Sequence, residues 1–316
     1  MASMKAVRIH SYGGSGVLAY ENTPRPAPRE GEILIRAHAT TVNPFDIAVR
    51  NGYMTGYFNH SLPLILGTDV SGVVEEVGAG VTDFSPGDEV YTRAGVYQDG
   101  SYAEYVLASA ADVTAKPKSL DHVQAAALPH VTLTAWQALY ELADIQEGQT
   151  VLIHGAAGGV GHMAVQLARL RGAKVIGTAS VNYSQLEDLG VDEAINYTTT
   201  PFETVAHDVD VVFDIIGGET QERSWWTLKP GGILVSTVQP PAEEAAAAHG
   251  VRHGFVNTSP PIAQTLAEVA RLADLGQIKP VVSTVLPLSE AQRAHQIIES
   301  GHTYGKIVLA VDEESV

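Results

Sequence analysis

One glycine-rich segment constrains the fold of this chain more than any other feature. The short apolar run Thr150–His154 predicts a buried strand, and the turn His154–Gly161 follows it directly. A helical pattern over Val160–Arg171 and a second strand at Lys174–Thr178 come next. A strand, a glycine-rich turn, a helix and a second strand in this order are typical of a dinucleotide-binding unit.

Small residues occupy the three special positions of that turn, with Ala156 in place of the first glycine, followed by Gly158 and Gly161. At Gly158 the absence of a side chain lets the backbone approach a pyrophosphate, which the positive end of the following helix attracts. At Gly161 it lets the helix pack closely against the strand. Glycine-rich turns also occur without a ligand, but the complete order of elements favours nucleotide binding. We therefore predict that Ala156, Gly158, Gly159, Val160 and Gly161 bind a dinucleotide.

Two domains are expected from a chain of 316 residues, since one domain takes roughly 150 residues. Short apolar runs separated by Gly and Pro predict a β-rich domain over the first 120 residues. From about Asp121 strands and helices alternate, and Pro129 must break or start the helix predicted over Val123–Leu142. Further strands at Val209–Ile215 and Gly232–Val238 predict an α/β domain whose parallel sheet is covered on both faces.

The last third of the chain is less regular. We expect a loop over Gln239–Ser259, with a helical turn at Glu243–Ala248. Two amphipathic helices follow at Ile262–Leu275 and Ser289–Ser300, and a strand is expected at Lys306–Val311.

The composition excludes several classes of function. The chain has no cysteine, which rules out disulfides, iron–sulfur clusters, cysteine-ligated zinc and a thiol nucleophile. Its 19 basic and 36 acidic residues give a net charge of −17, which disfavours nucleic acid and anionic membranes as partners. No apolar run has the length of a signal peptide or of a membrane span, so we expect a cytoplasmic protein.

The end of the second predicted strand suggests which cofactor is bound. No Asp or Glu stands there to hold the ribose 2′-hydroxyl of NAD. Thr178, Ser180 and Asn182 leave room for the 2′-phosphate of NADP, with hydroxyl and amide groups as donors. No Lys or Arg lies between Lys174 and Arg223, so we predict NADPH with a modest preference over NADH.

Segments along nearly the whole chain resemble the zinc-free quinone oxidoreductases of the medium-chain dehydrogenase/reductase superfamily, the group that includes zeta-crystallin. The matching stretches are VNPFDIAVRNG (42–52), LPLILGTDVSGVVEEVG (62–78), FSPGDEVY (84–91), DGSYAEYV (99–106), AAALPHVTLTAWQAL (125–139), HGAAGGVGHMAVQLAR (154–169), LKPGG (228–232) and HTYGKIVL (302–309). The combination is highly specific.

The resemblance implies an arrangement of the two domains along the chain. A GroES-like β-rich substrate domain would take residues 1–123 and 257–316, and a Rossmann domain with a doubly wound parallel sheet would take residues 124–256. The active site would lie in the cleft between them. Members of this family commonly form homodimers through their Rossmann sheets, and we expect the same here.

The resemblance also implies further site residues. Thr134 corresponds to a residue near the nicotinamide, as do Phe255 and Val256 in the segment that returns to the cleft. Tyr197 corresponds to a tyrosine that reaches the 2′-phosphate in NADP-specific members.

A catalytic metal is not expected. Zinc-dependent relatives have a Cys where this chain has Asn43 and a His where it has Thr68, and a catalytic zinc needs three protein ligands.

Two side chains remain as candidates for catalysis. Asn43 precedes Pro44 and Asp46 in a sequence typical of a capped helix start, so Asn43 either only caps the helix or also donates a hydrogen bond to a substrate carbonyl. We interpret Asp46 mainly as part of that cap. Tyr53 lies in an aromatic stretch; its phenol either orients a carbonyl and relays a proton or merely lines the cleft.

These observations predict an NADPH-dependent, metal-free reductase that transfers hydride to a quinone or an α,β-unsaturated carbonyl, with Tyr53 or water as the proton source. The substrate would be a small molecule. Two alternatives remain: an enoyl-thioester reductase of polyketide or fatty-acid chemistry, and a non-catalytic sensor or structural protein that binds NADPH.

Overall fold

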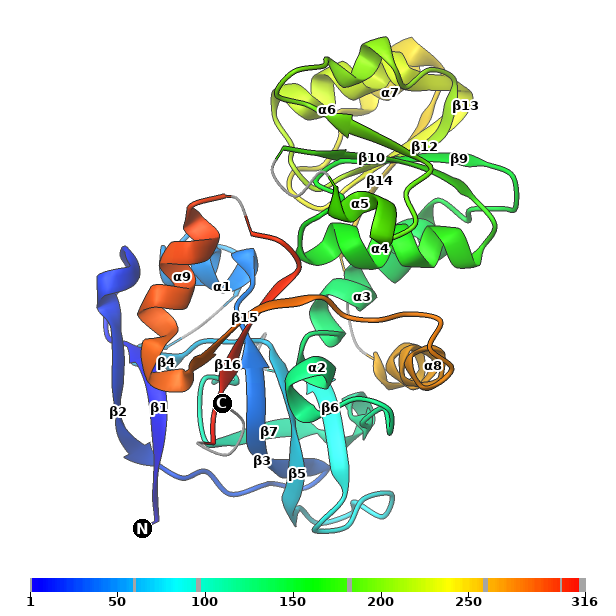
Figure 1. Ribbon diagram of the computed structural model, residues 1–316. Coiled ribbons are helices and arrows are strands. Elements are labelled where there is room, and N and C mark those ends of the chain that lie inside the picture. The colour runs from blue at the N-terminus through cyan, green and yellow to red at the C-terminus, as the bar shows by residue number, and fades with distance from the viewer. Residues whose placement is uncertain are drawn as a thin grey trace. The chain divides into compact units, whose positions relative to one another are not determined.

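The computed structural model describes residues 2–58, 61–94, 98–180, 184–257, 261–301 and 303–312 (Figure 1). The chain forms two compact units. The first comprises Met1–His130, Pro260–Gly276 and Pro280–Val316, and the second comprises Val131–Ser259 with Gln277–Lys279. No helix in the described part of the chain has the length and apolar character that crossing a membrane requires.

The first unit is β-rich. Its larger sheet has the order β15-β16-β3-β5-β6-β8, with β7 also paired to β3, and its smaller sheet has the order β2-β1-β4. Strands β15 and β16 are parallel, and the other pairs are antiparallel. The strands are β1 (Ser3–Ile9), β2 (Leu18–Pro24), β3 (Glu32–Thr41), β4 (Leu64–Ile65), β5 (Asp69–Val77), β6 (Glu89–Arg93), β7 (Tyr105–Ser109), β8 (Thr114–Ala115), β15 (Val282–Pro287) and β16 (Lys306–Ala310).

Helices of the first unit pack around these sheets. They are α1 (Pro44–Arg50), α2 (His122–Ala126), α8 (Ala263–Asp274) and α9 (Ala291–Glu299), and α3 (Pro129–Trp136) starts where the chain passes into the second unit. Pro129 starts a helix, as one of the two predicted outcomes, because its fixed φ and missing N–H suit the first turn. The helix α3 continues as a π-helical turn over Gln137–Leu142.

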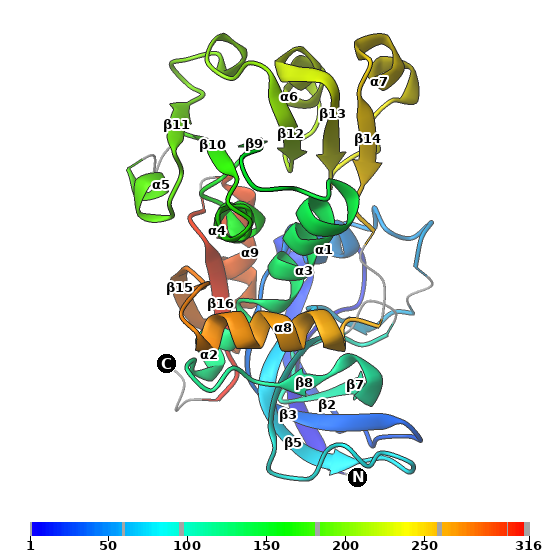
Figure 2. The same cartoon turned by 90° about the vertical axis from the view of Figure 1, so that its right-hand side faces the viewer.

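The second unit is a parallel sheet of order β11-β10-β9-β12-β13-β14, so the predicted α/β fold is confirmed. Its strands are rich in Val and Ile because both faces are covered: α4 and α5 lie on one face and α6 and α7 on the other (Figures 1 and 2). The elements are β9 (Thr150–Ile153), α4 (Gly159–Leu170), β10 (Lys174–Ala179), α5 (Gln185–Asp188), β11 (Glu193–Asn196), β12 (Val209–Asp214), α6 (Glu219–Ser224), β13 (Leu228–Ser236), α7 (Glu243–His249) and β14 (Arg252–Phe255).

One expectation for the second unit was wrong. The segment Gln239–Ser259 is not a loop throughout, because it contains the strand β14 as well as α7, which contains the predicted helical turn. Strand β14 has no apolar run that would mark it in the sequence. Its extended conformation comes from parallel pairing with β13, in which Ile233 lies opposite Arg252 and Ser236 opposite Phe255.

Candidate active site

The glycine-rich turn lies between β9 and α4, where the sequence predicts it. Gly155 has a left-handed backbone (φ 60°), which favours glycine. Gly158 is the N-cap of α4 in an extended conformation, so Gly159 and Val160 form the first turn, whose amides lack acceptors within the helix. Ala156 is fully buried, and its Cβ would lie 2.9 Å from a Cβ at Gly177 of the neighbouring strand. Small residues at both positions therefore let the turn pack on β10.

Gly158 and Gly161 differ in what a side chain would meet. A Cβ at Gly161 would lie 2.2 Å from the Gly155 carbonyl oxygen, so this position must be glycine for the helix to pack on the turn. A Cβ at Gly158 would have only that same oxygen nearby, at 3.2 Å. The space outside Gly158 is thus open, and amides at a helix N-terminus border it. This is a suitable site for a pyrophosphate, and the residues fit a dinucleotide.

The predicted ribose-binding residues lie at the carboxyl ends of two neighbouring strands, since Ala179 of β10 pairs with Asn196 of β11. Ser180 follows the first strand, and Tyr197, with half its surface exposed, follows the second. Thr178 is buried, and its hydroxyl contacts the turn itself. Asn182 lies outside the described residues.

The residues predicted to lie near the nicotinamide follow two other elements. Phe255 ends β14, and the amide of Val256 donates to the Ser236 carbonyl, which continues the pairing with β13. One residue further on, the Asn257 amide donates to the Gln137 Oε1 atom at 2.9 Å. Thr134 is a buried residue of α3, about one helical turn before Gln137.

Sequence reasoning missed two apolar side chains beside the turn. Ile216 and Val238 follow β12 and β13 and are 53% and 54% exposed. A Cβ at Gly155 would contact Ile216, and a Cβ at Gly217 would contact Val238, so the two side chains border one surface. Exposed apolar groups at the carboxyl edge of a parallel sheet are suited to pack on a flat base. Their exposure is visible only once the sheet is assembled.

In the first unit, Asn43 belongs to a buried polar cluster. Its side chain is 1% exposed, and the amide Nδ2 donates to Asp69 Oδ2 at 2.9 Å and to Thr68 Oγ1 at 3.1 Å. Its Oδ1 accepts from Lys306 Nζ at 2.6 Å. Both amide hydrogens therefore have acceptors inside the protein, which argues against donation to a substrate carbonyl.

Lys306 supplies a cation to the place where zinc-dependent relatives bind metal. Its Nζ lies 3.6 Å from Asp69 Oδ2, and both side chains are buried. Burial lowers the pKa of Lys306, and the Asp69 and Asp46 carboxylates oppose that shift. An ammonium bonded to Asn43 and beside Asp69 would repel a divalent cation, and neither Asn43 nor Thr68 is a good zinc ligand. These residues do not fit zinc. Among the described residues no group of three or more His, Asp or Glu side chains is arranged to hold a metal ion.

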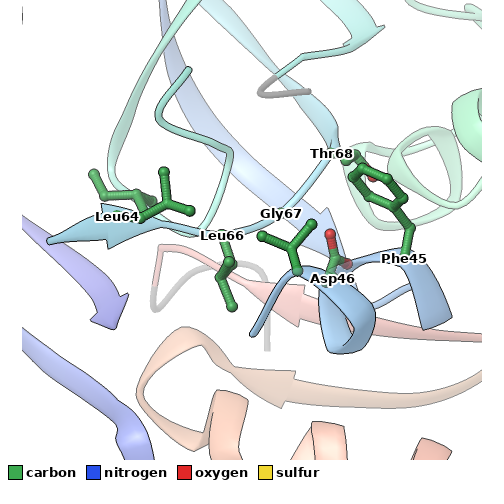
Figure 3. Close-up of a pocket in the computed structure, with 8 residues that line it drawn as sticks. Phe45, Asp46, Leu64, Leu66, Gly67 and Thr68 are labelled. Carbon is green, nitrogen blue, oxygen red and sulfur yellow. The ribbon is translucent and has the colours of Figure 1, made fainter. Parts of the chain in front are cut away.

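Asp46 completes the cap of α1, as interpreted from the sequence, and also belongs to a buried network of hydrogen bonds. Its Oδ2 accepts hydrogen bonds from the backbone N–H of Asn43 at 2.7 Å and from the Tyr102 hydroxyl at 3.2 Å. Tyr102 also pairs with His295 of α9, which pairs with Arg50. Burial raises the pKa of Asp46 to about 7. Its carboxyl is the one acidic group of a small hollow whose other walls are Phe45, Val49, Leu64, Ile65, Leu66, Gly67 and Thr68 (Figure 3).

Tyr53 follows α1 in a turn and is 74% exposed. The wall of the hollow beside Asp46 does not include it. Its phenol therefore has access to solvent, and its role in proton transfer stays a prediction.

The combination of these two units defines a class of protein. Residues 29–118 match the alcohol dehydrogenase GroES-like domain family, and residues 189–309 match a family described as zinc-binding dehydrogenase. A GroES-like unit together with a Rossmann unit is the architecture of the medium-chain dehydrogenase/reductase superfamily, which confirms the predicted fold class.

Individual relatives narrow the class to a family. The chain is 33% identical to a mitochondrial NAD(P)H oxidoreductase RTN4IP1 of Danio rerio, over 98% of this chain and 92% of that protein. The quinone oxidoreductase structure from Coxiella burnetii has a TM-score of 0.91 and 37% identity, covering 98% of this chain and all of that one. A mycobacterial protein, Rv1454c, complexed with NADPH has a TM-score of 0.88 and 31% identity with the same coverage. The chain belongs to the zeta-crystallin-like quinone oxidoreductase family of this superfamily.

Proposed function

We propose that this protein is an NADPH-dependent, metal-free reductase that transfers hydride to a quinone or an α,β-unsaturated carbonyl. The observation that carries the proposal is the turn after β9. A side chain at Gly161 would overlap the protein's own backbone, whereas a Cβ at Gly158 would have only the Gly155 carbonyl oxygen nearby, at 3.2 Å. An opening of this kind at a helix N-terminus is what a bound pyrophosphate requires. Relatives named as quinone and NAD(P)H oxidoreductases, and one complexed with NADPH, support it.

Residues of the second unit would hold the cofactor. Gly158, Gly159 and Val160 would contact the pyrophosphate through the backbone, and Ser180 and Tyr197 would contact the ribose phosphate. Ile216 and Val238 offer an apolar surface for a base. When bound, NADPH supplies a hydride from its nicotinamide ring.

The protein's own contribution would be to position the reactants and exclude water. No metal polarises the substrate in this proposal, because Lys306 and Asn43 occupy that place with an internal ion pair and hydrogen bonds. The proton that balances the hydride would come from Tyr53 or from water. Tyr53→Phe should slow turnover if the phenol is the donor and leave it unchanged if water is.

The test is the loss of NADPH and NADH absorbance with a panel of quinones, enals and enoyl-CoA esters, together with zinc analysis of the purified protein. Turnover of quinones or enals without bound zinc is expected. Turnover restricted to enoyl esters would instead identify an enoyl-thioester reductase. Cofactor binding without turnover of any compound would indicate a sensor or structural protein, and one chelatable zinc per chain would contradict the metal-free proposal.

A homodimer is the assembly that we propose. Strand β14 is at the edge of the parallel sheet, and Arg252, His253 and Phe255 on it are exposed. An unpaired edge of this kind can pair with the same edge of a second copy. Light scattering during gel filtration should give twice the chain mass. The cytoplasmic location also stays a prediction, because the Danio rerio relative is named as mitochondrial.

A further inference from the structure

A chain of hydrogen bonds inside the second unit runs from the glycine-rich turn to helix α6 and passes through His154. The Gly155 amide donates to Thr178 Oγ1 at 3.2 Å, and this oxygen lies 3.3 Å from His154 Nδ1. On the other side of the ring, His154 Nε2 lies 2.9 Å from Ser224 Oγ. The imidazole is buried and packs on the Phe202 ring in a T-shaped arrangement, with 4.6 Å between the ring centroids. Both ring nitrogens therefore have hydrogen-bond partners, and the sequence alone predicts neither of these two contacts.

The direction of each bond in this chain is fixed. Ser224 Oγ donates its single hydrogen to the Thr220 carbonyl at 2.6 Å, so it accepts from His154 Nε2–H. A neutral imidazole with its hydrogen on Nε2 presents Nδ1 as an acceptor. Thr178 Oγ1 accepts from Gly155 and donates its own hydrogen to Nδ1. Burial lowers the pKa of His154 to about 4, which keeps the ring neutral at physiological pH.

The chain of hydrogen bonds ends on Gly155, the residue that shapes the turn. Gly155 is the residue with the left-handed backbone, and its carbonyl oxygen accepts the Gly158 amide at 2.9 Å. The same oxygen is the atom that excludes a side chain at Gly161. The Gly155 amide and the Gly155 carbonyl belong to the two peptide groups that meet at the Gly155 Cα, so a change in the backbone angles of Gly155 would move the opening at Gly158.

We propose that His154 is a positioning residue for the pyrophosphate of the cofactor. By accepting from Thr178, it holds that hydroxyl under the Gly155 amide and so keeps the turn in its binding conformation before the ligand arrives. This inference rests on the proposed function, in which the second unit binds NADPH. Preorganisation of this kind raises affinity by removing the cost of ordering the loop on binding.

The alternative is that His154 is a polar side chain with satisfied hydrogen bonds whose loss affects only folding. The two roles differ in which part of the ligand they affect. If His154 positions the pyrophosphate site, its loss should weaken the binding of NADPH but not that of a nucleotide without a pyrophosphate, such as adenosine 2′-monophosphate. A purely structural role should weaken both ligands alike or neither.

Three variants of the full chain test this difference. His154→Phe keeps an aromatic ring against Phe202 and removes both hydrogen bonds. Thr178→Val removes the hydroxyl at nearly constant shape, and Thr178→Ser is the matched control that keeps it. Dissociation constants for NADPH and for adenosine 2′-monophosphate are measured by calorimetry, with thermal unfolding as a check on folding.

For NADPH we expect the dissociation constant to rise about five- to thirtyfold in His154→Phe and Thr178→Val, and less than about threefold in Thr178→Ser. The Thr178 hydroxyl is buried and bonded to Gly155 and His154, so it is not available to the 2′-phosphate, and the dissociation constant for adenosine 2′-monophosphate should stay within about twofold in all three variants. If His154→Phe does not fold, the two Thr178 variants carry the test. Equal weakening of both ligands, or an unchanged constant for NADPH, overturns the inference. A wild-type protein that binds neither NADPH nor NADH refutes the proposed function instead.

Discussion

Separate substitutions of Gly158 and Gly161 at the start of α4 distinguish the loss of ligand binding from the loss of folding. At Gly158 the backbone is extended (φ −80°, ψ −176°), which valine adopts readily, and the nearest obstacle is the Gly155 oxygen at 3.2 Å from the new Cβ. At Gly161 even alanine would place its Cβ 2.2 Å from that oxygen and 2.7 Å from the Ala156 Cα. We predict that Gly158→Val folds without binding cofactor and that Gly161→Ala folds poorly.

The magnitudes follow from these contacts. Valine is a poorer N-cap than glycine by about 1 kcal/mol, so Tm should fall by about 2–5 °C in Gly158→Val. Relief of the Gly161→Ala overlap needs a shift of about 1 Å in packed backbone, which costs about 3 kcal/mol and should lower Tm by about 8 °C or more. A pyrophosphate that loses two backbone donors in Gly158→Val loses about 3 kcal/mol or more, which is at least a hundredfold in affinity.

The assay is thermal unfolding followed by circular dichroism, combined with titration of NADPH into each variant. For Gly158→Val we expect a Tm within 5 °C of the wild-type Tm and no measurable binding of NADPH. The reasoning is refuted if this variant binds NADPH within threefold of the wild type, or if it unfolds as early as Gly161→Ala does.

Three further predictions concern charge. The ratio of kcat/KM for NADPH over NADH should be about 10–100, since the donors proposed for the phosphate are neutral, and Ser180→Asp should reverse this preference; a wild-type ratio below one contradicts the proposal. The pKa of His154 is about 4 in the fold and about 6.5 when unfolded, so the unfolded chain binds more protons in this range and stability is lost as pH falls below 6.5. Between pH 7.5 and pH 4.5, the free energy of unfolding measured in urea should fall by about 2.5 kcal/mol less in His154→Phe than in the wild type; an equal fall in both proteins would count against a neutral buried ring. Lys306→Met leaves Asp69 buried without its cation and should lower the free energy of unfolding by about 3–5 kcal/mol, whereas adding Asp69→Asn should restore part of it; an unchanged urea midpoint in Lys306→Met would contradict this.

Local signals in the sequence predict much of the second unit. The strand expected at Thr150–His154 is β9, the helix expected at Val160–Arg171 is α4, and the turn between them has the expected geometry. Each depends on hydrophobic periodicity and glycine stereochemistry within about 25 residues of chain. Pro129 likewise starts a helix for a reason internal to its own residue.

Features that depend on distant partners could not be predicted in this way. Strand β14 is defined by its neighbour β13, because Arg252 and His253 carry no strand signal of their own. The Asn43 side chain is committed to Lys306, which lies 263 residues further along the chain. Nothing near Lys306 in the sequence shows that its ammonium lies inside the protein.

The pairing of β3 with the late strand β16 has a consequence for how the protein is made. On the edge of β3 opposite β5, strand β7 covers Glu32–Arg36, whereas Ala39–Thr41 are covered by β16. At about 5–20 residues per second, a ribosome needs roughly 13–50 s to reach Lys306 after it has made Asn43. By the end of that interval the second unit has been synthesised, while Asp69 still has no counterion and part of β3 has an open edge. A ribosome-bound chain stalled before Lys306 should therefore resist protease in its second unit and be cut in its first.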